Sequence, residues 1–409
     1  MDKTLVKQYA ADAERRIREV HIGCFEGHDK PLFLISEEYP GIWLEHVYDS
    51  IFYAKSHPEH LEIARNTVRL FIAHQTPQGQ LPCYVWDHAR KGGDPAKLVG
   101  YGQTQEVVSF AKLCLMLWEM QPDDAFLGEI YTASAKWEAW LRRCRMTTGR
   151  GLVEMFVGFD TGHDNSERVD HMYYSGNRME NGEIVGADCP PEPGDTAPIL
   201  AVDMNCNLYA TERALAKMAK LLGKAEDALL YETRAAEVKG ALFAHCFDKE
   251  DCFFYDVDRF GRKRKIKSSA ILHLFMEGVL DKNADRDLID EIHRRYLRNP
   301  KEFWCRYPYP SVSLSEPSRE RHTMINSWGY YSQALIALRC SMWMDDYGFS
   351  EDYDHICERW VEAVTDNYPR YRFGQEIVPE TGVMSPCSDY YSSCMIFYLY
   401  AAKRIGVIG

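Results

Sequence analysis

The feature that most constrains the fold is a helical periodicity of apolar residues that recurs along nearly the whole chain. In the segments 107–118 and 208–222, apolar residues cover most sides of the predicted helix, and the second segment ends at Gly223 as a C-cap. A helix that is apolar on most sides must be covered on two faces. The sequence therefore predicts an inner ring of helices wrapped by an outer ring.

Twelve segments show this periodicity, which is enough for six consecutive helix pairs. The predicted helices span residues 3–20, 45–55, 58–75, 103–119, 125–144, 203–222, 224–246, 267–279, 284–297, 327–345, 351–366 and 389–405. No clean sequence repeat accompanies them, which disfavours a regular helical solenoid. We predict an all-α (α/α)6 toroid that forms a single domain over residues 1–409.

Three long connections interrupt the predicted helices, near residues 145–202, 300–326 and 367–388. Long connections in a compact domain are usually functional or disordered, and these contain many aromatic residues and prolines. We expect ordered loops, with possible short β-hairpins, at the mouth of an active site.

Composition excludes several classes of partner. The formal net charge is -13, which disfavours nucleic acid and anionic membranes as partners. No run of about 18 apolar residues exists, so no transmembrane helix is expected. The N-terminus shows no apolar signal region, and the 13 cysteines form no Cys-x-x-Cys pair or zinc-like spacing. We expect a cytoplasmic protein with reduced thiols, no metal and no cofactor.

The candidate chemistry lies in residues 158–170, where several acids, an asparagine, a histidine and an arginine crowd one loop. Glycoside hydrolysis needs two carboxyl groups in different environments, and a loop at the mouth of a helical barrel can hold one of them. Asp-Asn-Ser is also a common turn and N-cap sequence, so a capped surface turn remains the competing interpretation.

The segment 162–170, Gly-His-Asp-Asn-Ser-Glu-Arg-Val-Asp, resembles a signature of family 63 glycoside hydrolases and their mannosylglycerate-hydrolase-like relatives. Further segments resemble that family in the expected order: residues 39–50, 75–82, 100–105, 202–205 and 379–382. The resemblance covers about residues 35–405 and implies an (α/α)6 barrel. It also implies that Asp164 is the general acid, with Asn165 and Arg168 shaping its pocket.

The same resemblance suggests which other residues bind substrate. Gln103 and Asn205 lie in matching segments, while Trp43 and Trp328 could stack on sugar rings or pack in the core. For Asp49 and Asp203, recognition of sugar hydroxyl groups competes with N-capping of the adjoining helices.

The second carboxylate departs from the family pattern. It normally lies four residues before the proline of a Pro-x-Thr-Gly loop, and that position is Gln375 here. A one-residue shift would place Glu376 in this role, so we predict Glu376 as the base, with Glu380 as its rival. The role of acid requires a raised pKa for Asp164, which neighbouring aromatic residues and a nearby acid such as Asp160 could supply.

These observations predict an inverting exo-acting α-glycosidase that hydrolyses a small α-glucoside or α-mannoside with two carboxyl groups. Three alternatives stay open, and one of them is an unsaturated-uronyl hydrolase on the same barrel. A sugar epimerase of the N-acylglucosamine 2-epimerase type shares the toroid and depends on histidine pairs, and His46, His163 and His322 lie in candidate loops. A non-catalytic sugar-binding relative would also show an altered base region.

Overall fold

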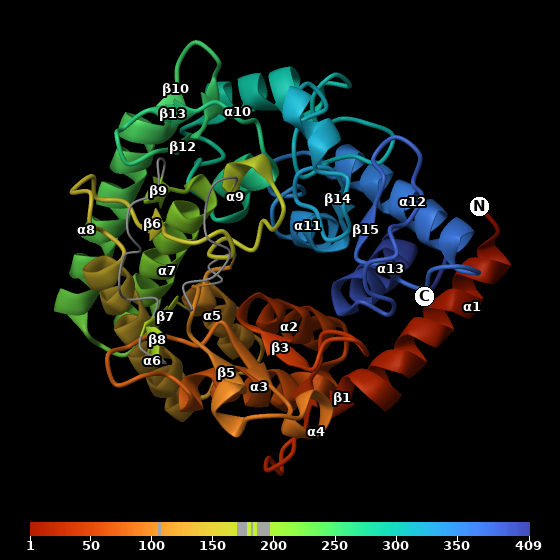
Figure 1. The fold of residues 1–409 in the computed structure, drawn as a ribbon, viewed down its shortest axis with the longest axis horizontal. Helices are drawn as coiled ribbons and strands as arrows, with labels where there is room; N and C mark the ends of the chain where they lie inside the picture. The colour runs from red at the N-terminus through yellow and green to blue at the C-terminus, as the bar shows by residue number, and fades with distance from the viewer. Residues whose placement is uncertain (105–107, 170–177, 181–182, 186–196) are drawn as a thin grey trace.

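The computed structural model describes residues 1–104, 108–169, 178–180, 183–185 and 197–409. Its helices form a closed ring of two layers, and the chain runs once around that ring from the N-terminus to the C-terminus (Figure 1). The last helix packs against both the first and second helices, which closes the ring. The predicted all-α toroid is confirmed.

Inner and outer helices alternate along the chain within the described residues. The inner helices are α2 (Val47–Ser56), α5 (Phe110–Met120), α7 (Val202–Leu221), α9 (His273–Met276), α11 (Ala334–Arg339) and α13 (Ser392–Arg404). The outer helices are α1 (Lys3–Arg16), α3 (Leu61–Ala73), α6 (Asp124–Cys144), α8 (Ala225–Ala241), α10 (Arg286–Ile292) and α12 (Ser350–Asn367).

Burial follows this division because only an inner helix has neighbours on two sides. Most of α7 is buried, including its polar residues Asp203 and Asn205, whereas α8 buries a single stripe of four residues. The all-round apolar pattern of the first and the weaker pattern of the second therefore have a direct structural cause.

Two predicted helices begin in the wrong place. Helix α5 begins after Ser109, whose hydroxyl accepts from the Lys112 N–H, so the described part of the predicted 103–109 stretch is not helical. The predicted helix 327–345 begins only at Ala334, because Ser332–Gln333 form strand β14. The short helix α4 (His88–Lys91) was not predicted.

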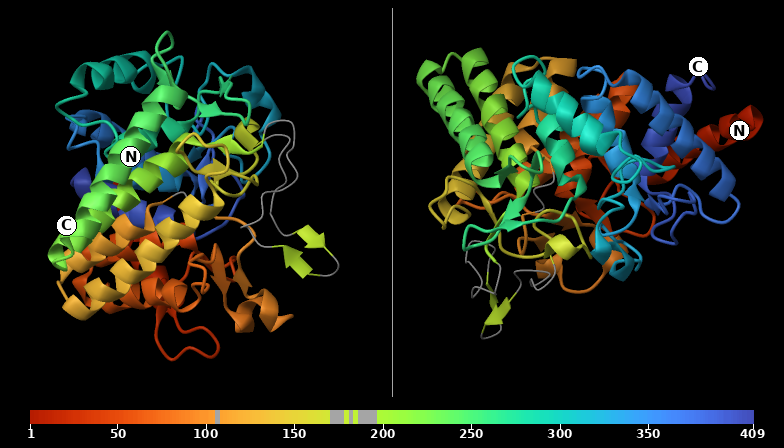
Figure 2. Two further views of the ribbon diagram at one scale, coloured as in Figure 1. Left: turned by 90° about the vertical axis from the view of Figure 1, so that its left-hand side faces the viewer. Right: turned by 90° about the horizontal axis from the view of Figure 1, so that it is seen from above.

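Short strands and long loops collect at one end of the ring (Figure 2). The strands are β1 (Ile22–Gly23), β2 (Leu32–Phe33), β3 (Gly41–Trp43), β4 (Tyr84–Trp86), β5 (Val99–Gly100), β6 (Glu154–Met155), β7 (Arg178–Glu180), β8 (Glu183–Val185), β9 (Ile199–Leu200), β10 (Phe247–Asp248), β11 (Phe253–Phe254), β12 (Asp256–Val257), β13 (Lys263–Arg264), β14 (Ser332–Gln333) and β15 (Glu376–Ile377).

Three of the strand groups at this end of the ring connect segments that are distant in the sequence. Strands β3, β4 and β5 form one antiparallel sheet, and β13, β12, β9 and β6 form a second. Strands β14 and β15 pair so that Gln333 faces Glu376. Among the described residues, no helix has the length and apolar character needed to cross a membrane.

We expect the buried inner ring to dominate stability. Leu208, on α7, is fully buried in the core, so Leu208→Ala should lower the free energy of unfolding by about 2–5 kcal/mol. Leu229, on α8, is 66 % exposed, and Leu229→Ala is the matched control with an expected change within about 0.5 kcal/mol. Urea denaturation followed by circular dichroism measures both, and equal effects would contradict the assignment of the two layers.

Candidate functional site

A cavity of about 230 Å³ opens among the loops at this end of the ring. Its lining combines aromatic rings with carboxyl, amide and imidazole groups. The described lining residues are Tyr39, Trp43, Glu45, His46, Gln103, Phe159, Gly162, Asp164, Asn326, Trp328, Leu335, Gln375 and Tyr391.

Asp164 reaches this cavity with a carboxyl group that is largely removed from solvent. Burial raises the pKa of Asp164 to about 8, and the negative charge of Glu45 contributes to that rise. A hydrogen bond donated by the Asn326 side-chain amide to Asp164 Oδ2, at 3.1 Å, acts in the opposite direction. Asp164 is therefore mostly protonated at neutral pH.

Asp160 does not supply this effect, contrary to the expectation from sequence. Its carboxylate is fully buried and pairs with Arg145, whose Nη1 lies 2.6 Å from Oδ2. It also accepts hydrogen bonds from the N–H groups of Thr104, Phe156 and Val157. The charge of Asp160 is compensated by these partners, and their contacts hold its own loop together. The acid whose charge contributes to the raised pKa of Asp164 is Glu45.

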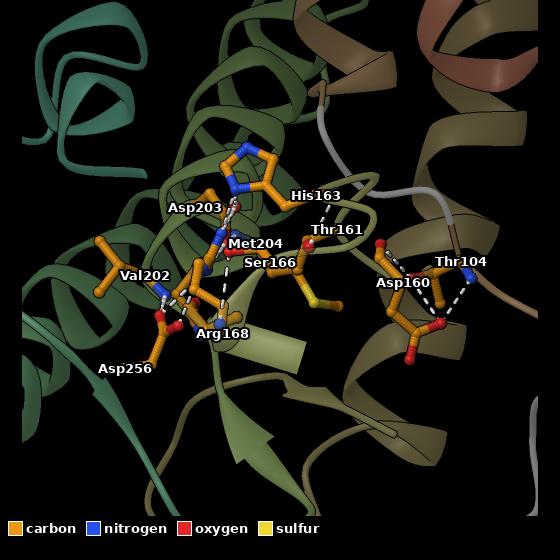
Figure 3. A network of polar contacts seen from close by, with 12 residues as sticks. Thr104, Asp160, Thr161, His163, Ser166, Arg168, Val202, Asp203, Met204 and Asp256 are labelled. Atoms are coloured by element: carbon orange, nitrogen blue, oxygen red, sulfur yellow. Dashed lines mark hydrogen bonds and ion pairs between the residues drawn. The ribbon is translucent and has the colours of Figure 1, made fainter. Parts of the chain in front are cut away.

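Arg168 anchors the loop that carries Asp164 (Figure 3). Its buried guanidinium donates to both carboxylate oxygens of Asp203, at 2.7 and 2.9 Å, and to both of Asp256, at 2.7 and 3.1 Å. Burial alone would raise the pKa of Asp203, but the adjacent Arg168 charge holds it well below the usual range. The two aspartates come from the start of α7 and from β12.

His163, next to Asp164, is held in one tautomer. Arg168 Nη1 donates to His163 Nδ1 at 2.5 Å, and since a guanidinium can only donate, Nδ1 carries no proton. Burial, aided by the Arg168 charge, lowers the pKa of His163 well below its usual value. The neutral ring therefore carries its proton on Nε2 and stacks on Trp328, with ring centroids 4.5 Å apart.

Asn326 connects three side chains, of which Asp164 and Gln375 line the cavity and Glu376 lies behind it. Its side chain donates to Asp164 and its Oδ1 accepts from Gln375 Nε2 at 2.9 Å. Its backbone N–H donates to Glu376 Oε1 at 2.8 Å. The position of Asp164 is thus coupled to the loop that contains Gln375 and Glu376.

Glu376 is fully buried behind this loop, whereas its neighbour Gln375 lines the cavity. Glu376 Oε2 accepts from the Ser327 N–H at 3.1 Å and from Gln333 Nε2 at 2.8 Å. Burial raises the pKa of Glu376 to about 7, and these donors act against the rise. Glu380 is exposed, pairs with Arg319 at 2.7 Å and is not among the described lining residues.

The structure brings together some of the predicted site residues and not others. Those that line the cavity are Asp164, Trp43, Gln103 and Trp328. Those that are absent from the described lining are Asp49, Arg168, Asp203, Asn205, Glu376 and Asn165. Asn165 nevertheless contacts the site, because its side chain donates to the Asn326 carbonyl oxygen at 2.9 Å.

Asp49 and Asn205 are engaged within the protein. Asp49 is buried and accepts from the hydroxyl groups of Ser392 and Ser393 at the start of α13. Asn205 bonds the backbone of Val153 in both directions and also donates to the Ala201 carbonyl oxygen. Their contacts connect helix α2 to α13 and helix α7 to the segment that contains Val153.

Sequence reasoning gave no site role to Glu45, Asn326 or Tyr391, which all line the cavity. Glu45 follows Trp43 by two residues in the segment 39–50, so its place in an aromatic-acid motif was an available signal. Tyr391 donates or accepts a 2.6 Å hydrogen bond with His46 Nε2, a contact across more than three hundred residues that no local pattern reveals.

A carboxylic acid that is protonated at neutral pH, among aromatic rings at one end of a two-layered helical ring, fits the acid that glycoside hydrolysis requires. Residues 48–391 match the profile of the mannosylglycerate hydrolase MGH1-like glycoside hydrolase domain, and the chain belongs to this family. A comparison with curated protein sequences finds no significant match.

Solved structures show the same fold. The GH63 mannosylglycerate hydrolase from Thermus thermophilus in complex with glucose is 19 % identical, with a TM-score of 0.73 over 96 % of this chain and 99 % of that one. Its complex with Tris and D-glycerate gives 18 % identity and a TM-score of 0.72 over 97 % and 99 % of the two chains. Neutral trehalase from Saccharomyces cerevisiae is 14 % identical, with a TM-score of 0.64 over 91 % and 73 %.

The raised pKa of Asp164 predicts a pH-dependent cost to stability. The folded-state pKa of Asp164, about 8, lies above the usual 3.8. The stabilising contribution of this carboxyl group to the free energy of unfolding is therefore complete below pH 3.8 and is lost as the pH rises through 8. Asp164→Asn, which cannot ionise, should therefore gain stability relative to wild type between pH 4 and 8.

Thermal unfolding of the two proteins across this pH range measures the difference. Asp366→Asn, at an exposed position of α12, is the matched control for the loss of one carboxylate. A stability difference between Asp164→Asn and wild type that stays constant with pH would contradict the buried, protonated state.

Proposed function

We propose that this chain is an inverting, exo-acting α-glycosidase that hydrolyses a small α-glucoside or α-mannoside, with Asp164 as its general acid. The observation that supports this most strongly is a carboxylic acid with a pKa of about 8 in a cavity lined by Trp43, Trp328 and two tyrosines. An acid that is protonated at neutral pH can donate to a leaving glycosidic oxygen. Aromatic faces can pack against the apolar faces of a sugar ring.

The hydrogen bonds of Asp164 favour one oxygen as the proton donor. Asn326 donates to Oδ2, so that oxygen acts as an acceptor, and in the acid form the proton lies on Oδ1. The backbone N–H of Trp328 donates to the backbone carbonyl oxygen of Asp164 at 2.8 Å, which fixes the backbone next to the acid. These contacts orient the carboxyl group before substrate binds, which lowers the cost of aligning it in the transition state.

The size of the cavity supports a short substrate. Its volume, about 230 Å³, lies below the ~300–1,000 Å³ that is typical of pockets for drug-sized ligands.

Asp164→Asn should reduce kcat on an α-glycoside by roughly 10²–10⁴-fold, because the amide cannot protonate the leaving oxygen. The same variant should keep most of its activity on the corresponding α-glycosyl fluoride, since fluoride departs without strong protonation. Steady-state kinetics on both substrates measure the contrast, and Asp366→Asn is again the control. Wild-type kcat for Asp164→Asn on the glycoside would contradict the assignment.

The stereochemistry is tested on the wild-type protein. Proton NMR during the first minutes of hydrolysis should show the β-anomer of the released sugar before mutarotation produces the α-anomer. Release of the α-anomer first would contradict inversion.

A further inference from the structure

The proposed hydrolysis needs a group that activates water, and the position expected to supply it cannot do so. Gln375 occupies that position and lines the cavity, but its neutral amide does not accept a proton at any ordinary pH. Its two polar atoms are also engaged, with Nε2 donating to Asn326 and Oε1 accepting from the Tyr39 hydroxyl. The role of another residue as the base rests on the proposed function, because only a hydrolase requires this group.

Glu376, the neighbour of Gln375, is placed to hold a loop. Its two oxygens accept three hydrogen bonds from Asn326, Ser327 and Gln333, and it is absent from the described lining of the cavity. A water that reached this carboxylate would have to displace N–H donors that keep residues 326–328 in place. Glu376 is therefore a positioning residue for Asn326, which in turn contacts Asp164.

Glu45 is the other carboxyl group of the described cavity lining. It lies in the short helical turn Leu44–His46 that follows β3, on a different segment from the Asp164 loop. Its side chain keeps about 10 % exposure, and its Oε2 lies 3.5 Å from Arg339 Nη2. The guanidinium is always charged, so it stabilises the ionised form of Glu45.

The two carboxyl groups thus differ in the way that acid–base catalysis requires. Asp164 has no cationic partner among its described contacts and is held in its protonated form, whereas Glu45 faces an arginine. The charge of Glu45 itself contributes to the raised pKa of Asp164, so the two groups interact across the cavity. A pair of carboxyl groups whose environments separate their protonation states identifies the acid and the base.

We propose that Glu45 is the general base that deprotonates the attacking water. The water oxygen forms a bond to the anomeric carbon while its proton moves to a Glu45 oxygen. The bond between the anomeric carbon and the glycosidic oxygen breaks, and that oxygen receives the proton of Asp164. The products are the inverted sugar and an alcohol, and transfer of one proton from Glu45 to Asp164 through solvent restores the enzyme.

The test compares Glu45→Ala with Glu376→Ala and Asp164→Asn on an α-glycosyl fluoride, in the presence and absence of sodium azide. Without azide, Glu45→Ala should lose roughly 10²–10⁴-fold in kcat. Azide needs no deprotonation and can occupy the space vacated by the carboxylate. It should restore turnover of Glu45→Ala and yield the β-glycosyl azide, which NMR and mass spectrometry identify.

Glu376→Ala should lose activity without rescue, because a displaced loop is not repaired by a nucleophile. Glu45→Gln should keep the wild-type melting temperature within a few degrees and lose the acidic limb of the pH profile of kcat/KM. That loss separates a base from a residue that only supports the fold.

Azide rescue of Glu376→Ala in place of Glu45→Ala would overturn the assignment, as would an intact acidic limb in Glu45→Gln. Failure of the proposed function is distinct from either result. If the wild type releases no sugar from α-glycosides or α-glycosyl fluorides, or releases it with retained configuration, the proposed function falls and the role of Glu45 falls with it.

Discussion

The ion pairs of the buried Arg168 guanidinium with Asp203 and Asp256 are the interactions on which the rest of the site depends. Its guanidinium lies between Asp203 at the start of α7, Asp256 on β12 and the ring of His163. Two carboxylates against one guanidinium leave an excess negative charge, and that charge is met by the N-terminus of α7. There the Val202 N–H donates to Asp256 and the Met204 N–H donates to Asp203. Breaking such a buried cluster by removing one partner typically costs about 3–5 kcal/mol.

Two asparagines, Asn165 and Asn326, fix the position of Asp164 in the loop that Arg168 anchors. Asn165 and Asn326 both adopt left-handed backbone conformations, with φ of 53° and 56°, which asparagine tolerates better than most residues. The Asn165 side chain bonds the Asn326 backbone, and the Asn326 side chain bonds Asp164. Gly329 allows the close approach, because a Cβ there would lie 3.0 Å from the Asn165 carbonyl oxygen and 2.5 Å from His322. Asp164 is therefore held both by its own loop and by the loop that carries Asn326.

The helices were predictable from sequence because each buries one or more stripes whose spacing is local. All twelve predicted segments contain a helix. The role predicted for Asp164 came from the resemblance of residues 162–170 to a family signature, because local composition alone equally predicts a capped turn. Tertiary pairing was not predictable in the same way. Residues 327–333 have helical periodicity, yet Ser332–Gln333 pair with Glu376–Ile377 as strands, because the Ser327 N–H and the Gln333 side chain bond the buried Glu376. For the same reason, the buried roles of Arg168, Asp203 and Asn205 depend on partners distant in sequence.

The amide at residue 375 has a consequence for the acid that a carboxylate would not have. Gln375 Nε2 donates to Asn326 Oδ1, and this bond turns the Asn326 amide so that its Nδ2 faces Asp164. An ionised carboxylate at residue 375 could only accept, so Asn326 would present Nδ2 to it and Oδ1 to Asp164. The Asp164 proton would then be drawn toward Asn326. With glutamine in this position, Asp164 Oδ2 accepts and Oδ1 keeps the proton for a substrate. The same residue that cannot act as a base thus helps to set the direction of the acid, and it leaves the activation of water to a carboxylate on another segment of the ring.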